Sequence, residues 1–317
     1  MATGNRMRRI GLWTLLLLSA AGWAAGSDGP GEPLAALTAK HFRLHTEPAA
    51  AETAQETLED LDRLWEYYVQ TLSALTTLRE STSRIDVYSF TGPEPLERFM
   101  AGVARDEIDV VYPGLPKSLT RGFLAVDSSR LLARSDLAIV FHDTAHLIHG
   151  LMLYEDGAVG SWWVREGLAA YLMQTRFDRD EQFRFGEIRT SEGYVSDISP
   201  AGRATIALNI ALEPKRELKA IRGRYKAGNH IPLETLLEQP GNEPWASDAL
   251  EEQAAVESWV LVHFLLHGAD WELRQRMARY FDLERSGKGG REAFRKTVAG
   301  DLAKFERLLF KHAKTMQ

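Results

Sequence analysis

The sequence predicts an α+β protein in which an N-terminal α/β lobe is followed by a mostly helical C-terminal lobe. Short runs of strand type alternate with helical patterns in the first half of the chain. Later apolar residues recur mainly at helical spacing. With 317 residues and 44% hydrophobic composition, the chain can bury one large core or two lobes, and we favour two. We expect residues 34–150 to form the first lobe and 151–317 the second.

The first 24 residues have the layout of a secretory signal peptide. Arg6, Arg8 and Arg9 precede an apolar run from Ile10 to Ala21, and residues 22–24 offer a cleavage site of the small-x-small type. A membrane span needs about 20 apolar residues, which is more than this run provides. We therefore expect a periplasmic or secreted protein with no stable membrane insertion after cleavage, and an uncleaved anchor is the alternative. Residues 25–33 are predicted as a disordered lead-in.

Composition excludes several classes of function. The chain has no cysteine, so it has no disulfide framework, no thiolate ligand and no thiol nucleophile. The formal net charge is −6, and removal of the three leader arginines takes it to −9. An acidic chain without a basic stripe argues against a nucleic acid partner. A Gly-x-Ser-x-Gly elbow of serine hydrolases is also missing.

The α/β lobe is predicted element by element from its hydrophobic periodicity. Residues 41–46 alternate as a strand, and apolar residues from Leu58 to Leu72 recur at helical spacing. A further strand is expected at 84–90 and a short helix at 95–104. Residues 122–126 and 130–133 are predicted as a hairpin. Its first strand, Phe123 to Val126, is a candidate edge strand for pairing with an extended peptide. The alternative is an ordinary core hairpin.

A buried helix carrying two histidines is expected to follow the hairpin. Apolar residues between Leu137 and Leu151 leave almost no polar face, and Gly150 is predicted to end the helix early. His142 and His146 lie one turn apart, so both imidazoles can reach one ion of the size of zinc. The alternative interpretation is a pair of core histidines bonded to backbone groups.

A second motif follows twenty residues later. Residues 163–171 read Trp-Val-Arg-Glu-Gly-Leu-Ala-Ala-Tyr, on a helix expected from Trp162 to Gln174 with Ser161 as its N-cap. Glu166 would complete a metal site with the two histidines. We expect the tryptophans and Tyr171 to serve mainly in packing.

Together, His-x-x-x-His and the later Glu-Gly-Leu-Ala-x-Tyr-Leu resemble the gluzincin zinc metallopeptidases. The resemblance is to the peptidase MA-like domains of uncharacterised bacterial exported proteins in particular, and its specific motifs cover only residues 142–171. It implies a zincin-like fold for the first lobe, an active-site helix, and Zn²⁺ held by His142, His146 and Glu166. It also implies a peptide or protein substrate.

This chain departs from the family pattern at two positions. Asp143 stands where the family motif, His-Glu-x-x-His, has its general base. Aspartate is one methylene shorter, which sets the carboxylate back by about 1 Å and can cost on the order of a hundredfold in rate. Ala170 stands where gluzincins often carry an acidic residue that orients a zinc-binding histidine. The resemblance also implies an oxyanion-stabilising side chain, for which Tyr194, Tyr225 and His230 are candidates that no spacing separates.

The second lobe contains another pair of histidines one turn apart. A short helix is expected from Pro232 and longer ones at 251–267, 271–284 and 301–315, with a linker at 286–290. His263 and His267 belong to the first of the longer helices. No third ligand is marked for them, and His267 precedes Gly268, where a helix C-terminus favours an imidazole. We therefore do not expect a metal there.

Two hypotheses for the function follow. The first is an exported zinc peptidase in which Asp143 takes a proton from the metal-activated water. The second is a catalytically impaired module that retains the metal and binds extended peptides without cutting them. The shortened base and Ala170 motivate the second hypothesis.

Overall fold

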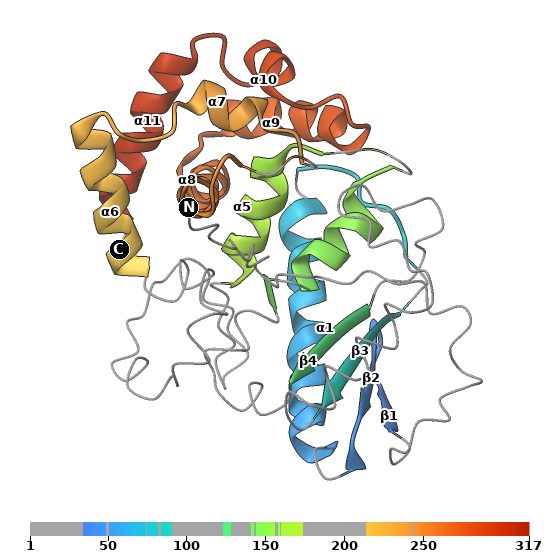
Figure 1. Cartoon of the computed structure of the whole chain (residues 1–317). Coiled ribbons are helices and arrows are strands. Elements are labelled where there is room, and N and C mark those ends of the chain that lie inside the picture. The colour runs from blue at the N-terminus through green and yellow to red at the C-terminus, as the bar shows by residue number, and fades with distance from the viewer. Residues whose placement is uncertain are drawn as a thin grey trace, which may run out of the picture.

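The computed structural model describes residues 34–48, 51–73, 75–81, 84–90, 123–127, 141–142, 144–155, 158, 160–173, 214–241, 243 and 245–316. Over these residues the protein is mostly helical and carries one small sheet, so the α+β class is confirmed. The predicted signal peptide, the lead-in and the helix expected at 95–104 lie outside the described residues. Figure 1 shows the sheet and α1 at one end of the chain fold and the C-terminal helices at the other.

The sheet has four strands in the order β1-β2-β3-β4. β1 pairs antiparallel with β2, whereas β2 pairs parallel with β3 and β3 parallel with β4. β2, β3 and β4 match the predicted strands, whereas β1 was not predicted. The strands are β1 (Ala35–Thr38), β2 (Phe42–Thr46), β3 (Ile85–Phe90) and β4 (Phe123–Asp127).

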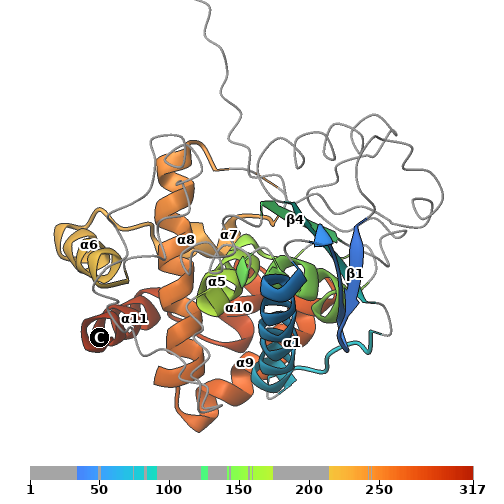
Figure 2. The ribbon, with the colours of Figure 1, turned by 90° about the horizontal axis from the view of Figure 1, so that it is seen from below.

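Helix α1, Ala51–Ser73, connects β2 to the parallel strand β3 and packs against the sheet. Strand alternation turns Phe42 and Leu44 of β2 into the core, where both are fully buried. Trp65 of α1 meets Phe42 edge to face at 5.9 Å between ring centroids. The helical spacing of apolar residues in α1 therefore reflects one stripe that covers the sheet. Figure 2 shows α1 beside the strands.

The predicted histidine helix is present, with residues 141–142 and 144–148 in α-helical conformation. Its expected end at Gly150 is wrong, because the chain continues as the π-helix η3, His149–Leu153. Most side chains of this segment are buried, and its apolar residues, such as Phe141, Ile148 and Leu153, pack in the core, so packing outweighs the cost of one glycine in the helix.

Helix α8 (Asp248–His263) packs against three of the remaining helices, α5, α6 and α11. Figures 1 and 2 agree that α8 lies between α5 and α6, and α5 packs closely along α8. Among the described residues, no helix combines the length and the apolar character that a membrane span requires. The helices are α5 (Trp162–Met173), α6 (Pro214–Ala227), α7 (Leu233–Glu238), α8 (Asp248–His263) with its π-helical extension η5 (Phe264–Gly268), α9 (Trp271–Arg285), α10 (Arg291–Thr297) and α11 (Leu302–Thr315).

Candidate metal centre

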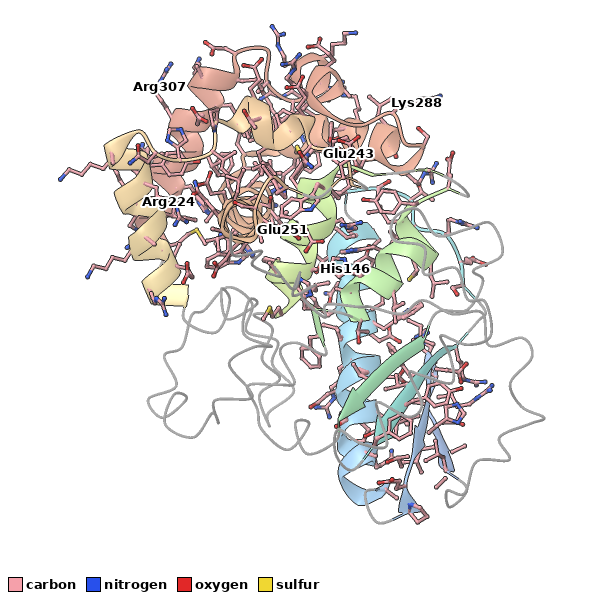
Figure 3. The ribbon with its side chains drawn as sticks, viewed as in Figure 1. His146, Arg224, Glu243, Glu251, Lys288 and Arg307 are labelled. Carbon is pink, nitrogen blue, oxygen red and sulfur yellow. The ribbon has the colours of Figure 1, made fainter. Side chains whose placement is uncertain are left out.

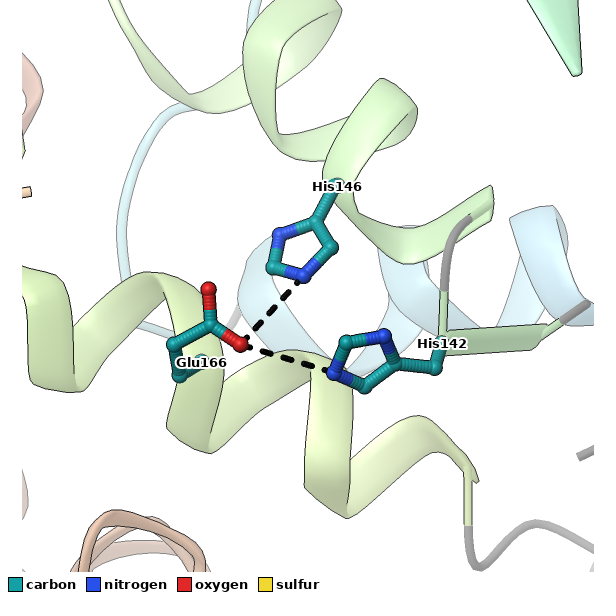
Figure 4. Close-up of side chains that lie close together, drawn as sticks. All are labelled: His142, His146 and Glu166. Carbon is teal, nitrogen blue, oxygen red and sulfur yellow. Dashed lines mark ion pairs between the residues drawn. The ribbon is translucent and has the colours of Figure 1, made fainter. Parts of the chain in front are cut away.

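Three side chains from two helices meet at the centre of the fold. His142 and His146 lie four residues apart on one face of their helix and are 5% and 7% exposed. Glu166 faces them from α5. Figure 4 shows one carboxylate oxygen of Glu166 directed at both imidazoles, and Figure 3 places His146 between the two helices. The structure thus brings together the three residues that the sequence singles out, and their role as metal ligands stays a prediction.

The separations between these ligand atoms fit a metal better than they fit hydrogen bonds. Nε2 of His142 and Nε2 of His146 each lie 3.5 Å from Oε2 of Glu166. All three ligand atoms lie within 4.8 Å of one another. Ligand atoms around a tetrahedral zinc, with bonds of about 2.0 to 2.2 Å, stand about 3.4 Å apart. Good hydrogen bonds to a carboxylate are shorter, at roughly 2.7 to 2.9 Å. The donor set and its spacing therefore suit Zn²⁺.

The protonation states also suit a cation. Burial alone would raise the pKa of Glu166, but His146, His142 and Arg165 outweigh it, and the pKa lies well below its usual range. Burial lowers the pKa of His146, an effect that Glu166 only partly offsets. An ionised carboxylate and a neutral imidazole are the forms that bind metals. Arg165 donates from Nη2 and Nε to Oε1 of Glu166, at 3.2 and 3.3 Å, which leaves Oε2 to the histidines.

Gly167 allows α5 to approach α8 closely. A Cβ atom at this position would lie 2.7 Å from the carbonyl oxygen of Ser258 and 2.8 Å from Cγ2 of Val262. Any side chain would push the two helices apart. The glycine next to Glu166 in the motif is thus explained by helix packing, which holds the glutamate at a fixed height beside the histidines.

The segment that joins the two ligand helices is fastened to α9 by one buried carboxylate, Glu284. The amide and the hydroxyl of Ser161 both donate to it, the hydroxyl at 2.8 Å, and Tyr280 donates at 2.9 Å and Tyr154 at 3.4 Å. Ser161, the predicted N-cap of α5, is therefore also an anchor to a distant helix. Trp163 is fully buried against Tyr280, which confirms that it is a packing residue.

The second ring nitrogen of His146, which faces away from Glu166, lacks a hydrogen-bond partner among the described residues. This atom, Nδ1, is buried, and Ala170 is buried without a polar group to offer. His149, three residues after His146, is 1% exposed and both of its ring nitrogens are also unpartnered. His149 was not among the predicted site residues, although it lies three positions after His146 on the same helix, a spacing that places the two side chains close together.

The other predicted site residues lie either outside the described residues or away from Glu166. Asp143 and Tyr194 lie outside the described residues. Tyr225 stacks on His230, with ring centroids 4.3 Å apart, and His230 pairs with Glu306 at 3.4 Å. This group lies at α6 and α11, and Figures 1 and 2 show α8 between α6 and the ligand helix α5. Neither Tyr225 nor His230 is among the residues that the structure brings to Glu166.

The second histidine pair belongs to a hydrogen-bonded network. Nδ1 of His263 lies 2.9 Å from Nε2 of His312, and Nε2 of His267 lies 2.8 Å from the hydroxyl of Tyr171. Burial, with smaller contributions from the two other histidines, lowers the pKa of His263 to about 3. Within the described part of the chain, the ligand atoms of His142, His146 and Glu166 are the one group of three close enough to share an ion. Tyr171 is 2% exposed and packs in the core, as expected.

Comparison with known proteins gives only a distant likeness. No family model matches the chain, and no curated protein matches it. Yeast LTA4 hydrolase in complex with bestatin is similar at 18% sequence identity and a TM-score of 0.39, over 87% of this chain and 37% of the hydrolase. The native yeast LTA4 hydrolase gives 17% and 0.38, over 89% and 36%. The chain thus spans little more than a third of the length of these structures.

Proposed function

We propose that this chain is an exported, zinc-dependent metallopeptidase that hydrolyses peptide bonds by means of a metal-activated water. The observation that carries the proposal is the meeting of His142, His146 and Glu166, with both Nε2 atoms 3.5 Å from one carboxylate oxygen. Two imidazoles and one carboxylate are the ligand set of many catalytic zinc sites, which leave the fourth position for water or substrate. A purely structural zinc site would close that position with a fourth protein ligand.

The roles of the chain's own residues follow from their chemistry. Zinc held by His142, His146 and Glu166 would supply a Lewis acid for the scissile carbonyl and would lower the pKa of a bound water to around 7. Glu166 supplies the negative charge of the ligand set, and Arg165 fixes its other oxygen. Asp143, next to His142 in the sequence, is the proposed general base that accepts the proton of the attacking water. Its reach is shorter than that of glutamate, so we expect slow turnover.

An extended peptide is the proposed substrate, and β4 is the proposed strand for aligning it. β4 stands at the end of the strand order and pairs with β3 on one side. An outer strand edge offers backbone donors and acceptors to a peptide. Residues 130–133, the second strand of the predicted hairpin, lie outside the described residues, so the choice between a substrate edge and a core hairpin stays a prediction.

A second candidate function is a module that retains the metal and binds peptides without cutting them. It is favoured by Ala170 and by the lack of a direct hydrogen-bond partner for Nδ1 of His146 among the described residues, because loss of an outer partner of a metal-binding histidine typically lowers activity roughly ten- to a hundredfold. The shorter Asp143 adds a further reduction. Both candidates need the same metal site and differ only in turnover.

The metal site is tested first by zinc content. Protein purified without chelators is expected to hold about one zinc per chain, and His146→Ala is expected to lose it. His41→Ala is a suitable control, because His41 lies against Trp65 of α1 in a separate ring contact. Metal analysis by mass spectrometry that finds no zinc in the wild-type protein would refute the proposed site.

Turnover is tested with a mixed peptide library, read by mass spectrometry, and the variants Asp143→Glu and Asp143→Ala. If carboxylate reach limits the rate, Asp143→Glu raises hydrolysis by roughly ten- to a hundredfold with zinc content unchanged. Cleavage that survives in Asp143→Ala would exclude Asp143 as the base. Peptides retained but left uncut by wild type and by Asp143→Glu, with zinc bound, would favour the binding module.

A further inference from the structure

Three buried polar groups lie together behind the proposed metal site. Nδ1 of His146, both ring nitrogens of His149 and the hydroxyl of Tyr68 have no hydrogen-bond partner among the described residues. The ring centroid of His149 lies 6.0 Å from that of His146 and 5.1 Å from that of Tyr68. Tyr68 is fully buried and His149 nearly so. Buried polar groups are rarely left unpaired, so their grouping here needs an explanation.

The distance between the two imidazole rings excludes a direct hydrogen bond between them and fits one bridging water. Ring centroids 6.0 Å apart leave about 3.7 Å or more between the nitrogens of His146 and His149, which is too long for a hydrogen bond. One bridging water spans two bonds of about 2.8 Å each. A buried water typically makes about three hydrogen bonds to otherwise unsatisfied groups. His146, His149 and Tyr68 together supply that number of partners.

We propose that His149 is a positioning residue for the metal ligand His146, acting through one buried water that His146 Nδ1, His149 and Tyr68 share. The inference rests on the proposed metal site. His149, three residues after the ligand on the same helix, then takes the role of outer partner that Ala170 cannot fill.

The proton chemistry of His146 requires such a partner. Nε2 of His146 faces Glu166, so a metal bound there leaves the ring proton on Nδ1. That N–H then needs an acceptor, which orients the ring and raises its basicity as a ligand. A neutral His149 has a free lone pair with which to hold the water, and a charged imidazole buried without an anion beside it would be costly. Tyr68 can both donate to the water and accept from it.

The test compares zinc affinity in three variants and one control, by competition with a chromophoric chelator. His149→Phe and Tyr68→Phe each remove polar atoms and keep a ring, and His149→Gln restores a side-chain amide that can bind the water. His41→Phe is the matched control, because it is a half-buried histidine stacked on Trp65. The Co²⁺-substituted protein gives a second readout, since its absorption spectrum reports ligand geometry without any activity assay.

We expect His149→Phe to weaken zinc binding by roughly ten- to a hundredfold, Tyr68→Phe to weaken it less, and His149→Gln to recover most of the loss. The Co²⁺ spectrum should change in the first two variants only. Unchanged affinity in both phenylalanine variants would overturn the inference, as would an equal loss in His41→Phe. If His149→Phe does not fold, Tyr68→Phe decides. A wild-type protein that binds no zinc refutes the proposed function as well, whereas zinc-binding wild type with unaffected variants refutes this inference alone.

Discussion

Replacing Glu284 by alanine is expected to destabilise the junction between the two helices of the metal site. The carboxylate is fully buried in α9 and accepts hydrogen bonds from Ser161, Tyr280 and Tyr154. Because α5 begins one residue after Ser161, these bonds fix the start of the helix that carries Glu166. Burial raises the pKa of Glu284, because removing the carboxylate from water disfavours its charged form, and the hydrogen bonds from its donors partly offset this cost.

The magnitude follows from what the truncation leaves behind. The hydroxyls of Ser161 and Tyr280 lie 3.2 Å apart and can turn to each other, but the amide of Ser161 has no such choice. One orphaned buried donor costs about 1 to 3 kcal/mol. The cavity left by the lost side chain adds about 1 to 2 kcal/mol, judged from large-to-small core substitutions. We therefore expect Glu284→Ala to lower the free energy of unfolding by about 2 to 5 kcal/mol, the sum of these two contributions.

Urea unfolding of the metal-free protein, followed by circular dichroism, measures this change without interference from zinc. Glu284→Gln is the matched control: it preserves the shape of the side chain and can still accept from the amide of Ser161, so about 1 to 2 kcal/mol is expected. A free energy for Glu284→Ala within about 1 kcal/mol of wild type, at an unchanged dependence on urea, would refute the reasoning. It would mean that the four donors find water when the carboxylate is gone.

Two further predictions concern α8. Burial raises the pKa of Glu257 to about 7 from 4.5, so this group favours the fold below pH 4.5 and loses that contribution as the pH rises to about 7. The loss is on the order of 3 kcal/mol at ~1.4 kcal/mol per pKa unit. In Glu257→Gln, the free energy of unfolding measured in urea should depend less on pH over this range. A pH dependence equal to that of wild type would contradict the assignment. Gly167→Ala should cost about 1 to 3 kcal/mol because its Cβ meets Ser258, whereas Gly223→Ala, with open space around it, should not destabilise.

The elements that the sequence predicts correctly are those with a strong local period. Helix α1 and strand β2 each bury one face, so their apolar residues recur with a regular period. This period can be recognised in the sequence without knowing which surface the face packs against. The spacing of His142 and His146 can be recognised for the same reason, since one turn of helix brings them to one face. Glu166 could not be predicted from this spacing, and it was identified from the motif at residues 163–171.

The elements and contacts that the sequence did not predict are those that depend on tertiary contacts and not on a local sequence pattern. β1 is half exposed and is held by pairing with β2, so its short sequence has no distinctive alternation. α6 is dominated by charged residues and buries few apolar side chains, including Leu218 and Ile221. Gly150 does not end its helix, because the surrounding core stabilises the continuation η3. No local rule could have brought Glu284 to Ser161, which lies 123 residues away.

The candidate metal centre therefore depends on two kinds of information. The identity of the ligands is local, because His142 and His146 share a helix face and Glu166 lies in a short motif. Their meeting is not local. It depends on the approach of α8 to Gly167 and on the anchor that α9 provides through Glu284. Both contacts come from the second half of the chain, so the candidate site is a property of the whole fold even though a stretch of twenty-five residues contains its three predicted ligands.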